Sequence, residues 1–244
     1  MRRIVVIGGT SLIAQHVVRQ WVLQAPAEVH LVGRDATRLA DVGRDLQVRS
    51  PNSQVHVHAL DILDREAVDT LIAELATQPI DLALIAHGTL PDQQAAQSDR
   101  ALAQNSLLVN GNSVVLMAES LVAAMDPRRS ASIVILGSVA GDRGRKSNYI
   151  YGTAKAMVAT HAAGLQHRLA STAIRVVLVK PGPTATPMTS ALGMSRLADP
   201  AAVAADIVRG VERGAAVIYT PRIWQVIMLV IRHLPAVVFN RINL

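Results

Sequence analysis

The chain has 244 residues, half of them hydrophobic, which is enough to bury the core of a single α/β domain, and we expect residues 1–244 to form one domain. It contains no cysteine, which excludes disulfides, thiolate metal ligands and a cysteine nucleophile, so we expect a cytoplasmic protein and no bound metal ion. Lysine and arginine outnumber aspartate and glutamate by 24 to 18, yet two tryptophans, three tyrosines and one phenylalanine offer no stacking platform, which argues against a nucleic-acid partner.

Seven short β-branched runs alternate with longer stretches rich in alanine and leucine. Repetition of strand and helix with almost wholly apolar strands is typical of a parallel sheet covered by helices on both faces. We therefore predict a doubly wound, seven-stranded parallel sheet of the Rossmann type, which binds ligands at the carboxyl ends of its strands. The runs expected to form strands are 4–7, 29–32, 55–58, 81–85, 133–136, 175–179 and 216–219.

The turn after the first run is rich in glycine and opens a helix that we expect to end near residue 24. Such a turn lets backbone amides at a helix N-terminus approach a pyrophosphate, whose negative charge the helix dipole favours. The alternative is an ordinary strand-to-helix turn in which the glycines supply positive φ angles. The residues expected to contact a dinucleotide here are Gly8, Thr10, Ser11, Leu12 and Ile13.

The loop after the second run reads Gly33-Arg34-Asp35 and lacks an acidic residue at the place where one would pair with the adenosine ribose. An arginine at that place can bind a ribose 2′-phosphate, so the sequence favours NADP(H), with NAD(H) as the alternative cofactor. The other interpretation of Arg34 is a solvated side chain in a loop that opens a helix.

The loops after the third and fourth runs complete the expected cofactor site. Asp61, followed by Ile62, can accept a hydrogen bond from the adenine amino group, or it can cap a helix that begins near Asp64. In the next loop, small residues beside His87 would let the backbone lie against the cofactor. We interpret this histidine as a loop residue rather than a catalyst, because no acidic residue adjoins it to orient the ring. The expected contacts in that loop are Ala86, His87 and Gly88.

A tyrosine and a lysine four residues apart carry the strongest chemical signal. Tyr151 and Lys155 fall within a helix expected over 148–170, where this spacing places them on one face. The ammonium favours the phenolate and so lowers the tyrosine pKa from about 10. In a reduction, the phenol gives its proton to the alkoxide that forms as hydride reaches a carbonyl carbon. Ser138, at the end of the fifth run, can bind the substrate oxygen.

These residues, in this order, resemble the short-chain dehydrogenase/reductase family across essentially the whole chain. The resemblance implies that Asn110 helps to hold a proton relay through Lys155, with Asn105 and Asn112 as nearby competitors for that role. It also implies a homodimer or homotetramer, and a loop after the sixth run that contacts the nicotinamide. The residues expected in that loop are Pro181, Gly182, Thr184 and Thr186.

Two departures from the family pattern weigh on this resemblance. The family's first turn usually has three glycines, and here Leu12 and Ala14 stand at two of those places. Because Leu12 adds a side chain where the backbone should approach the phosphates, cofactor affinity or loop geometry is expected to be unusual. The fourth loop lacks the usual Asn-Asn-Ala-Gly. Tyr149 is a decoy, because residue 153 is threonine rather than lysine.

Residues 221–244 are expected to form a helical extension. Their apolar stretch ends at Arg232, far short of the roughly 20 residues that a membrane-spanning helix needs. Apolar residues flanked by Arg222, Arg232 and Arg241 suit peripheral contact with the inner face of a membrane or closure of an apolar substrate channel. Packing on the chain's own domain or on a partner subunit is the alternative.

The catalytic pattern and the tail are together similar to a bacterial subgroup, the keto-reductase of the decaprenylphosphoryl-ribose 2-epimerase system. That similarity implies reduction of a 2-keto pentose carried on a polyprenyl phosphate, which is a lipid-linked substrate. Arg143, Arg145 and Lys146 precede Tyr151, where they either meet a substrate phosphate or form a solvated loop. The similarity lies in residues 8–11, 151–155 and 232–235.

The sequence therefore predicts an NAD(P)H-dependent carbonyl reductase or alcohol dehydrogenase that acts through Ser138, Tyr151, Lys155 and Asn110. One alternative is a generalist reductase of a soluble ketone or a β-ketoacyl group. Another is a sensor that binds NADP without turnover. The intact proton donor argues against the sensor, because binding alone does not need one.

Overall fold

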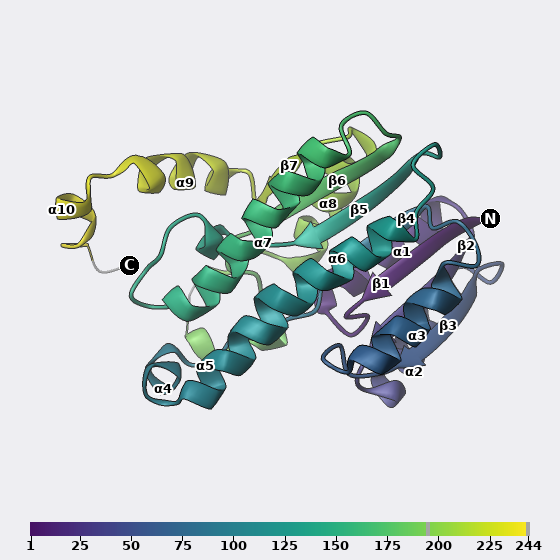
Figure 1. The fold of residues 1–244 in the computed structure, drawn as a ribbon, viewed down its shortest axis with the longest axis horizontal. Coiled ribbons are helices and arrows are strands. Elements are labelled where there is room, and N and C mark those ends of the chain that lie inside the picture. Colours follow the sequence, from purple (N-terminus) through teal and green to yellow (C-terminus); the bar gives the residue numbers. More distant parts are fainter. Residues whose placement is uncertain (194–195, 243–244) are drawn as a thin grey trace.

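The computed structural model describes residues 1–193 and 196–242, which contain one seven-stranded parallel sheet in the order β3-β2-β1-β4-β5-β6-β7 (Figure 1). The predicted doubly wound fold and its seven strands are confirmed. Because the strand order reverses between β1 and β4, a ligand crevice is expected at the carboxyl ends of these two strands. The strands are β1 (Arg2–Ile7), β2 (Ala27–Gly33), β3 (Gln54–Ala59), β4 (Leu82–Ile85), β5 (Ala131–Leu136), β6 (Ile174–Pro181) and β7 (Val217–Thr220).

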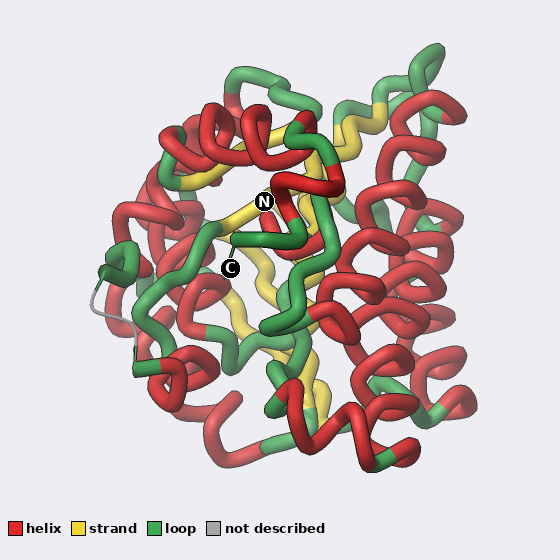
Figure 2. Tube along the Cα trace, turned by 90° about the vertical axis from the view of Figure 1, so that its left-hand side faces the viewer, coloured by secondary structure: helices red, strands yellow, loops and turns green. Residues whose placement is uncertain are grey.

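Helices cover both faces of the sheet (Figure 2). Side chains alternate along each strand, so Ile4 and Val6 of β1 enter one hydrophobic layer, and Val5 and Ile7 enter the other. The first layer is completed by α1 (Leu12–Gln24), α2 (Ala36–Arg49) and α8 (Pro200–Glu212). The second is completed by α3 (Arg65–Leu75), α6 (Ser113–Ala123) and α7 (Tyr149–Arg168).

Aspartates fix the starts of three of these helices. The side chains of Asp35, Asp64 and Asp199 accept hydrogen bonds from backbone amides in the first turns of α2, α3 and α8. Each such cap contributes about 1 kcal/mol. Asp61 instead accepts from the amide of Leu63 in the preceding turn, so the interpretation of Asp61 as the helix cap is wrong.

One helical stretch among the described residues, Arg100–Ala123, is long and apolar enough to cross a membrane by length and composition. It comprises α5 (Arg100–Leu107), a π-helical turn η1 (Leu108–Asn112) and α6, preceded by the short α4 (Gln93–Ser98). Half of its apolar window is buried, and the side chains of Met117 and Leu121 lie in the second hydrophobic layer. Packing against the sheet therefore explains its composition.

The C-terminal tail comprises α9 (Ile223–His233) and α10 (Ala236–Phe239), which extend away from the sheet (Figure 1). One side of α9 is buried, where Met228 packs with Val139. The guanidinium of Arg143 donates to the carbonyls of Ile231 and Leu234, both at 2.6 Å, and so caps the end of α9. The tail is thereby fastened to the loop that follows β5.

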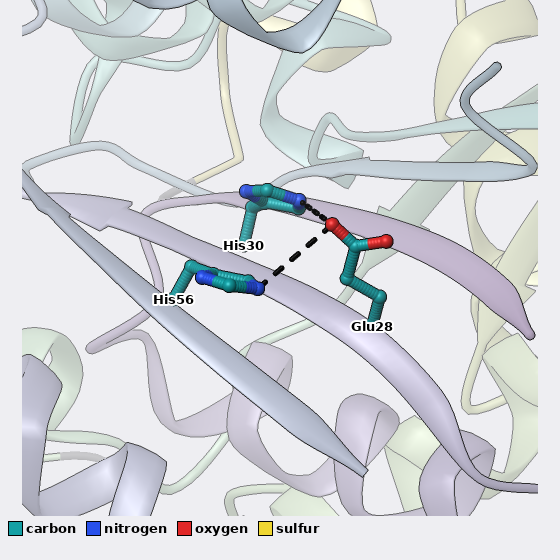
Figure 3. A group of neighbouring side chains, drawn as sticks. All are labelled: Glu28, His30 and His56. Carbon is teal, nitrogen blue, oxygen red and sulfur yellow. Dashed lines mark hydrogen bonds and ion pairs between the residues drawn. The ribbon is translucent and has the colours of Figure 1, made fainter. Parts of the chain in front are cut away.

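The edge strand β3 departs from the expected apolar pattern. Its His56 lies beside Glu28 and His30 of β2, with the His30 and Glu28 side chains 2.9 Å apart (Figure 3). The Nε of Arg3 donates to Nε2 of His30 and lies 3.4 Å from Oε1 of Glu28. A fixed guanidinium therefore already contacts the atoms that a metal ion would need.

Candidate active site

A cleft of about 420 Å³ opens at the carboxyl ends of the strands. Of the residues predicted to bind the cofactor or to act in catalysis, all but the buried Asn110 line it. Of the further candidates, Asn105 and Arg145 line the cleft, and Asn112, Arg143 and Lys146 do not. The predicted residues that the cleft does bring together are Gly8, Thr10, Ser11, Leu12, Ile13, Arg34, Asp61, Ile62, Ala86, His87, Gly88, Ser138, Tyr151, Lys155, Pro181, Gly182, Thr184 and Thr186.

The glycine-rich turn brings the backbone close to the neighbouring loop. Gly8 has a φ of +86°, and a Cβ there would lie 2.5 Å from the amide nitrogen of His87, so only glycine fits. Ser11 precedes α1, but its side chain does not cap the helix, and no acidic residue lies in the first turn. The first amides of α1 are therefore free of a side-chain cap, which suits a pyrophosphate despite Leu12.

Two arginines line the cleft near the end of β2. Arg34 is in the loop, and Arg38 lies one turn into α2. The carboxylate of Asp35 accepts from the amide of Arg38 at 3.0 Å, so it is engaged as a helix cap rather than left for a ribose. This charge distribution fits a 2′-phosphorylated adenosine ribose. Arg38 was not predicted from sequence, because it lies within the helix that follows this loop rather than in the loop itself.

The three predicted catalytic side chains converge on one part of the cleft. Ser138 follows β5 and opens the short 3-10 helix η2 (Val139–Gly141), where its Oγ accepts from the amide of Ala140 at 3.1 Å. From α7, the Nζ of Lys155 donates to the carbonyl of Leu136 at 3.1 Å and lies 5.7 Å from the centre of the Tyr151 ring. Tyr151, which can donate a proton, therefore lines the same part of the cleft as the polar groups of Ser138 and Lys155.

Burial has the largest effect on the pKa values of Tyr151 and Lys155. It raises the pKa of Tyr151 to about 12, against the opposing effect of a hydrogen bond with Ser138. The expectation of a lowered tyrosine pKa is therefore wrong: the net shift is upward, because desolvation disfavours the phenolate more strongly than the polar neighbours favour it. Burial also lowers the pKa of Lys155 to about 8. At neutral pH the phenol is protonated, as an acid for carbonyl reduction must be.

Asn110 lies in η1 and is fully buried. Its Oδ1 accepts from the amide of Thr89 at 2.8 Å, and its Nδ2 donates to the carbonyl of Ser106 at 3.0 Å. A Cβ on Gly88 would lie 2.7 Å from that Oδ1, which explains the glycine. The side chain therefore positions the loop after β4, and its predicted part in a proton relay stays a prediction.

The loop after β6 is supported by the tail. The hydroxyl of Thr184 donates to the carbonyl of Gly182 at 2.9 Å, and Thr186 opens the short helix η3 (Pro187–Leu192). A Cβ on Gly182 would lie 1.9 Å from Nε1 of Trp224 in α9. The indole therefore packs directly on this loop, a contact that sequence spacing does not reveal.

The model of the short chain dehydrogenase family matches residues 2–196. The chain is also 33% identical over 241 residues to the uncharacterized oxidoreductase Rv2073c of Mycobacterium tuberculosis, which covers 98% of this chain and 96% of the relative. The chain belongs to the short-chain dehydrogenase family. It is therefore an oxidoreductase, and the family resemblance seen in the sequence is confirmed. The narrower resemblance to the ribose 2-epimerase subgroup stays a prediction.

Two further proteins are similar to this short-chain dehydrogenase. A sulfoacetaldehyde reductase of Chromohalobacter salexigens is 32% identical over 163 residues, covering 65% of this chain and 63% of the relative. The structure of a short chain dehydrogenase from Burkholderia cenocepacia in complex with NADP superposes with a TM-score of 0.84 at 19% identity, covering 99% of this chain and 98% of the other. The structural likeness agrees with the Rossmann-type fold.

In this short-chain dehydrogenase, His87 is a half-buried, neutral side chain. Its Nε2 is 2.9 Å from the hydroxyl of Ser113, which itself donates to the carbonyl of Val109, so the histidine is the donor. Its Nδ1 is buried and has no hydrogen-bond partner in the described part of the chain. Burial, assisted by the charge of Lys155, lowers the pKa of His87 to about 3. His87 is therefore unsuited to act as a general acid at neutral pH.

This depressed pKa predicts a loss of stability in acid. The folded-state pKa of His87, about 3, lies below the unfolded value of 6.5, so below about pH 6.5 the unfolded chain binds a proton that the folded chain does not. Between about pH 7.5 and about pH 5 this histidine is expected to lower the free energy of unfolding by about 2 kcal/mol. Urea unfolding of the wild type and of His87→Gln at both pH values measures its share, because the other histidines titrate in both proteins. Equal pH dependence in the two proteins would contradict the assignment.

Proposed function

We propose that this chain is an NADP(H)-dependent carbonyl reductase. The observation that carries the proposal is the convergence of Ser138, Tyr151 and Lys155 in a cleft whose other end offers a glycine turn and two arginines. A bound nicotinamide supplies the hydride for such a reduction. One of the relatives is named a sulfoacetaldehyde reductase, and reduction of an aldehyde belongs to this reaction class.

Each catalytic side chain has a distinct role in this proposal. The hydroxyl of Ser138 donates to the carbonyl oxygen and holds it beside Tyr151. The phenol of Tyr151 gives its proton to that oxygen as the alkoxide forms. Lys155, protonated below its pKa of about 8, stabilises the phenolate that remains. Asn110 fixes the loop after β4 against this group through Thr89.

The proposed preference for NADP(H) over NAD(H) depends on Arg34 and Arg38. Both line the end of the cleft where a ribose 2′-phosphate would lie, and the carboxylate of Asp35, which follows Arg34, accepts from a backbone amide. Arginine matches the geometry and charge of a phosphate through paired N–H groups. The structurally similar Burkholderia protein was solved with NADP, which agrees with this choice.

The direct test is consumption of NADPH in the presence of a simple 1,2-dicarbonyl, followed by the loss of NADPH absorbance. The proposal expects turnover that depends on both the cofactor and the carbonyl. Tight NADPH binding without turnover of any carbonyl would instead establish the non-catalytic sensor. Comparable turnover of varied soluble ketones and β-ketoacyl compounds would favour the generalist alternative.

A lipid-linked keto sugar is our proposal for the physiological substrate, with the protein cytoplasmic and peripheral at the inner face of the membrane. The exposed side of the tail supports this, because its large apolar side chains lack cover in the described structure and adjoin exposed arginines. As the family resemblance implies, we also propose a homodimer or homotetramer. The exposed apolar residues are Ile223, Val226, Leu229, Val230, Val237 and Val238, and the arginines are Arg222, Arg232 and Arg241.

Vesicles containing anionic lipid test the membrane contact. Wild-type protein is expected to pellet with them, and the double variant Leu229→Asp, Val230→Asp is expected to stay in the supernatant, since it charges only the exposed side of α9. This variant leaves Met228 and Trp224 in place, so it is a cleaner change than removal of residues after 221. Equal pelleting of the two proteins would show that the exposed side of α9 does not make the membrane contact, and absence of wild-type protein from the pellet would contradict the contact itself. If the wild type does not bind vesicles and the double variant has a lower oligomeric mass than the wild type, the exposed side of α9 is a subunit interface instead.

A further inference from the structure

We propose that Arg145, together with Asn148, forms an anion-binding subsite in the cleft, so that the carbonyl substrate carries an acidic group. The shared chemistry is an oxyanion, whether phosphate, sulfonate or carboxylate, on a molecule small enough to bring its carbonyl to Tyr151. This inference rests on the proposed reductase function, because the same cleft must hold both groups of one substrate.

The position of Arg145 separates it from its charged neighbours. It lies in the segment between η2 and α7 and lines the cleft together with Ser138 and Tyr151. Arg143, two residues earlier, turns the other way and caps α9 through the carbonyls of Ile231 and Leu234. Of the three cations that the sequence places before Tyr151, Arg145 alone contributes to the wall of the cleft.

The guanidinium of Arg145 has no partner within the described residues. Its Nε is buried and makes no hydrogen bond, and burial is the sole cause that lowers its pKa, with no carboxylate acting on it. The nearest acidic residue along the chain, Asp142, is fully engaged, because it is ion-paired with Lys180 and accepts from the hydroxyl of Tyr219 at 2.8 Å. The protein therefore does not supply the counter-charge.

Asn148 provides a second polar group without a partner. It precedes α7, yet its side chain does not cap that helix, and its buried Oδ1 makes no hydrogen bond among the described residues. The two ends of a side-chain amide are interchangeable by rotation, so the group can present its NH₂ to a ligand. It lines the cleft together with Arg145 at the N-terminus of α7, whose dipole favours an anion.

Arg145 is half-buried, and its Nε gives up water without gaining a partner among the described residues, which has a cost in free energy that a bound anion would offset. A guanidinium binds a carboxylate or a tetrahedral oxyanion through two parallel N–H groups, which gives both strength and orientation. The phosphates of the dinucleotide have other matches, at the N-terminus of α1 and at Arg34 and Arg38. The anion that completes Arg145 is therefore expected on the substrate.

Matched pairs of carbonyl compounds test the subsite by activity. We would compare dihydroxyacetone phosphate with dihydroxyacetone, and sulfoacetaldehyde with acetaldehyde, using NADPH. Wild-type kcat/KM is expected to be at least about tenfold higher for the anionic member of one or both pairs. Arg145→Gln should lose that preference while changing the neutral compounds less than about threefold, and Arg145→Lys should keep an intermediate preference. Lys146→Gln, which removes an exposed neighbouring charge, is the control and should behave as wild type.

Binding of inorganic phosphate gives a readout that does not need turnover. With the cofactor site saturated by NADP⁺, calorimetry should detect phosphate binding to wild type and to Lys146→Gln, and not to Arg145→Gln. If Arg145→Gln loses phosphate binding and the wild type turns over no carbonyl compound, the subsite is supported and the reductase function is overturned. Turnover with no anionic preference and no Arg145-dependent phosphate binding would overturn the subsite and leave the reductase intact. Equal losses of kcat/KM for neutral and anionic compounds in Arg145→Gln would also overturn the subsite.

Discussion

Replacement of Tyr151 by phenylalanine is expected to lower kcat for carbonyl reduction by at least about a thousandfold. The substitution removes only the hydroxyl, so the packing of the ring in α7 should persist. Without it, the alkoxide that forms as hydride arrives loses the proton donor assigned to it, and His87, with a pKa of about 3, cannot act as a replacement acid. NADPH affinity should stay within about twofold, since the loss affects the transition state rather than binding. Fluorescence titration and NADPH consumption measure the two quantities.

Tyr149→Phe is the matched control for this prediction. Tyr149 begins the same helix, but its side chain is exposed and it does not line the cleft, so activity should be unchanged. Ser138→Ala should lower kcat by about a hundredfold, because it removes one hydrogen bond to the carbonyl oxygen. More than a tenth of wild-type activity in Tyr151→Phe would show that another group supplies the proton.

The sheet and the cleft were predictable because they depend on local patterns. A run such as residues 133–136 is apolar on both sides, which only a strand covered by helices on both faces requires. Parallel strands then bring the residues after each carboxyl end to one edge, so Ser138, Arg34 and Asp61 could be assigned to one site from the sequence alone.

Contacts between distant segments were not predictable in the same way. No spacing rule connects Trp224 with Gly182, and none shows that Arg143 is used by the tail whereas Arg145 is left for the cleft. The pKa of Tyr151 was misjudged for a related reason. Helical spacing gives the distance to Lys155, but the dominant effect is the depth of burial, which only the packed structure provides.

The double variant Arg34→Ala, Arg38→Ala is expected to weaken NADPH binding by at least about a hundredfold and NADH binding by less than about threefold. Both arginines line the cleft at the end of β2. NADPH differs from NADH only by the 2′-phosphate, which is the group that the two guanidinia would bind. Each single variant should show part of this loss of NADPH binding. Because the interaction is between charges near the surface, the NADPH preference of the wild type should also shrink as salt concentration rises.

Arg44→Ala is the matched control, since Arg44 lies on the same helix but pairs with Asp41 at the surface and does not line the cleft. It changes the net charge by the same amount as one of the test substitutions, so a general electrostatic effect would appear in it as well. Selective loss of NADPH binding in the arginine variants of the cleft, with Arg44→Ala unchanged, would assign the 2′-phosphate to Arg34 and Arg38. Equal binding of NADPH and NADH by the wild type would instead show that these two cations face solvent in the bound state, and the preference for NADP(H) would be wrong.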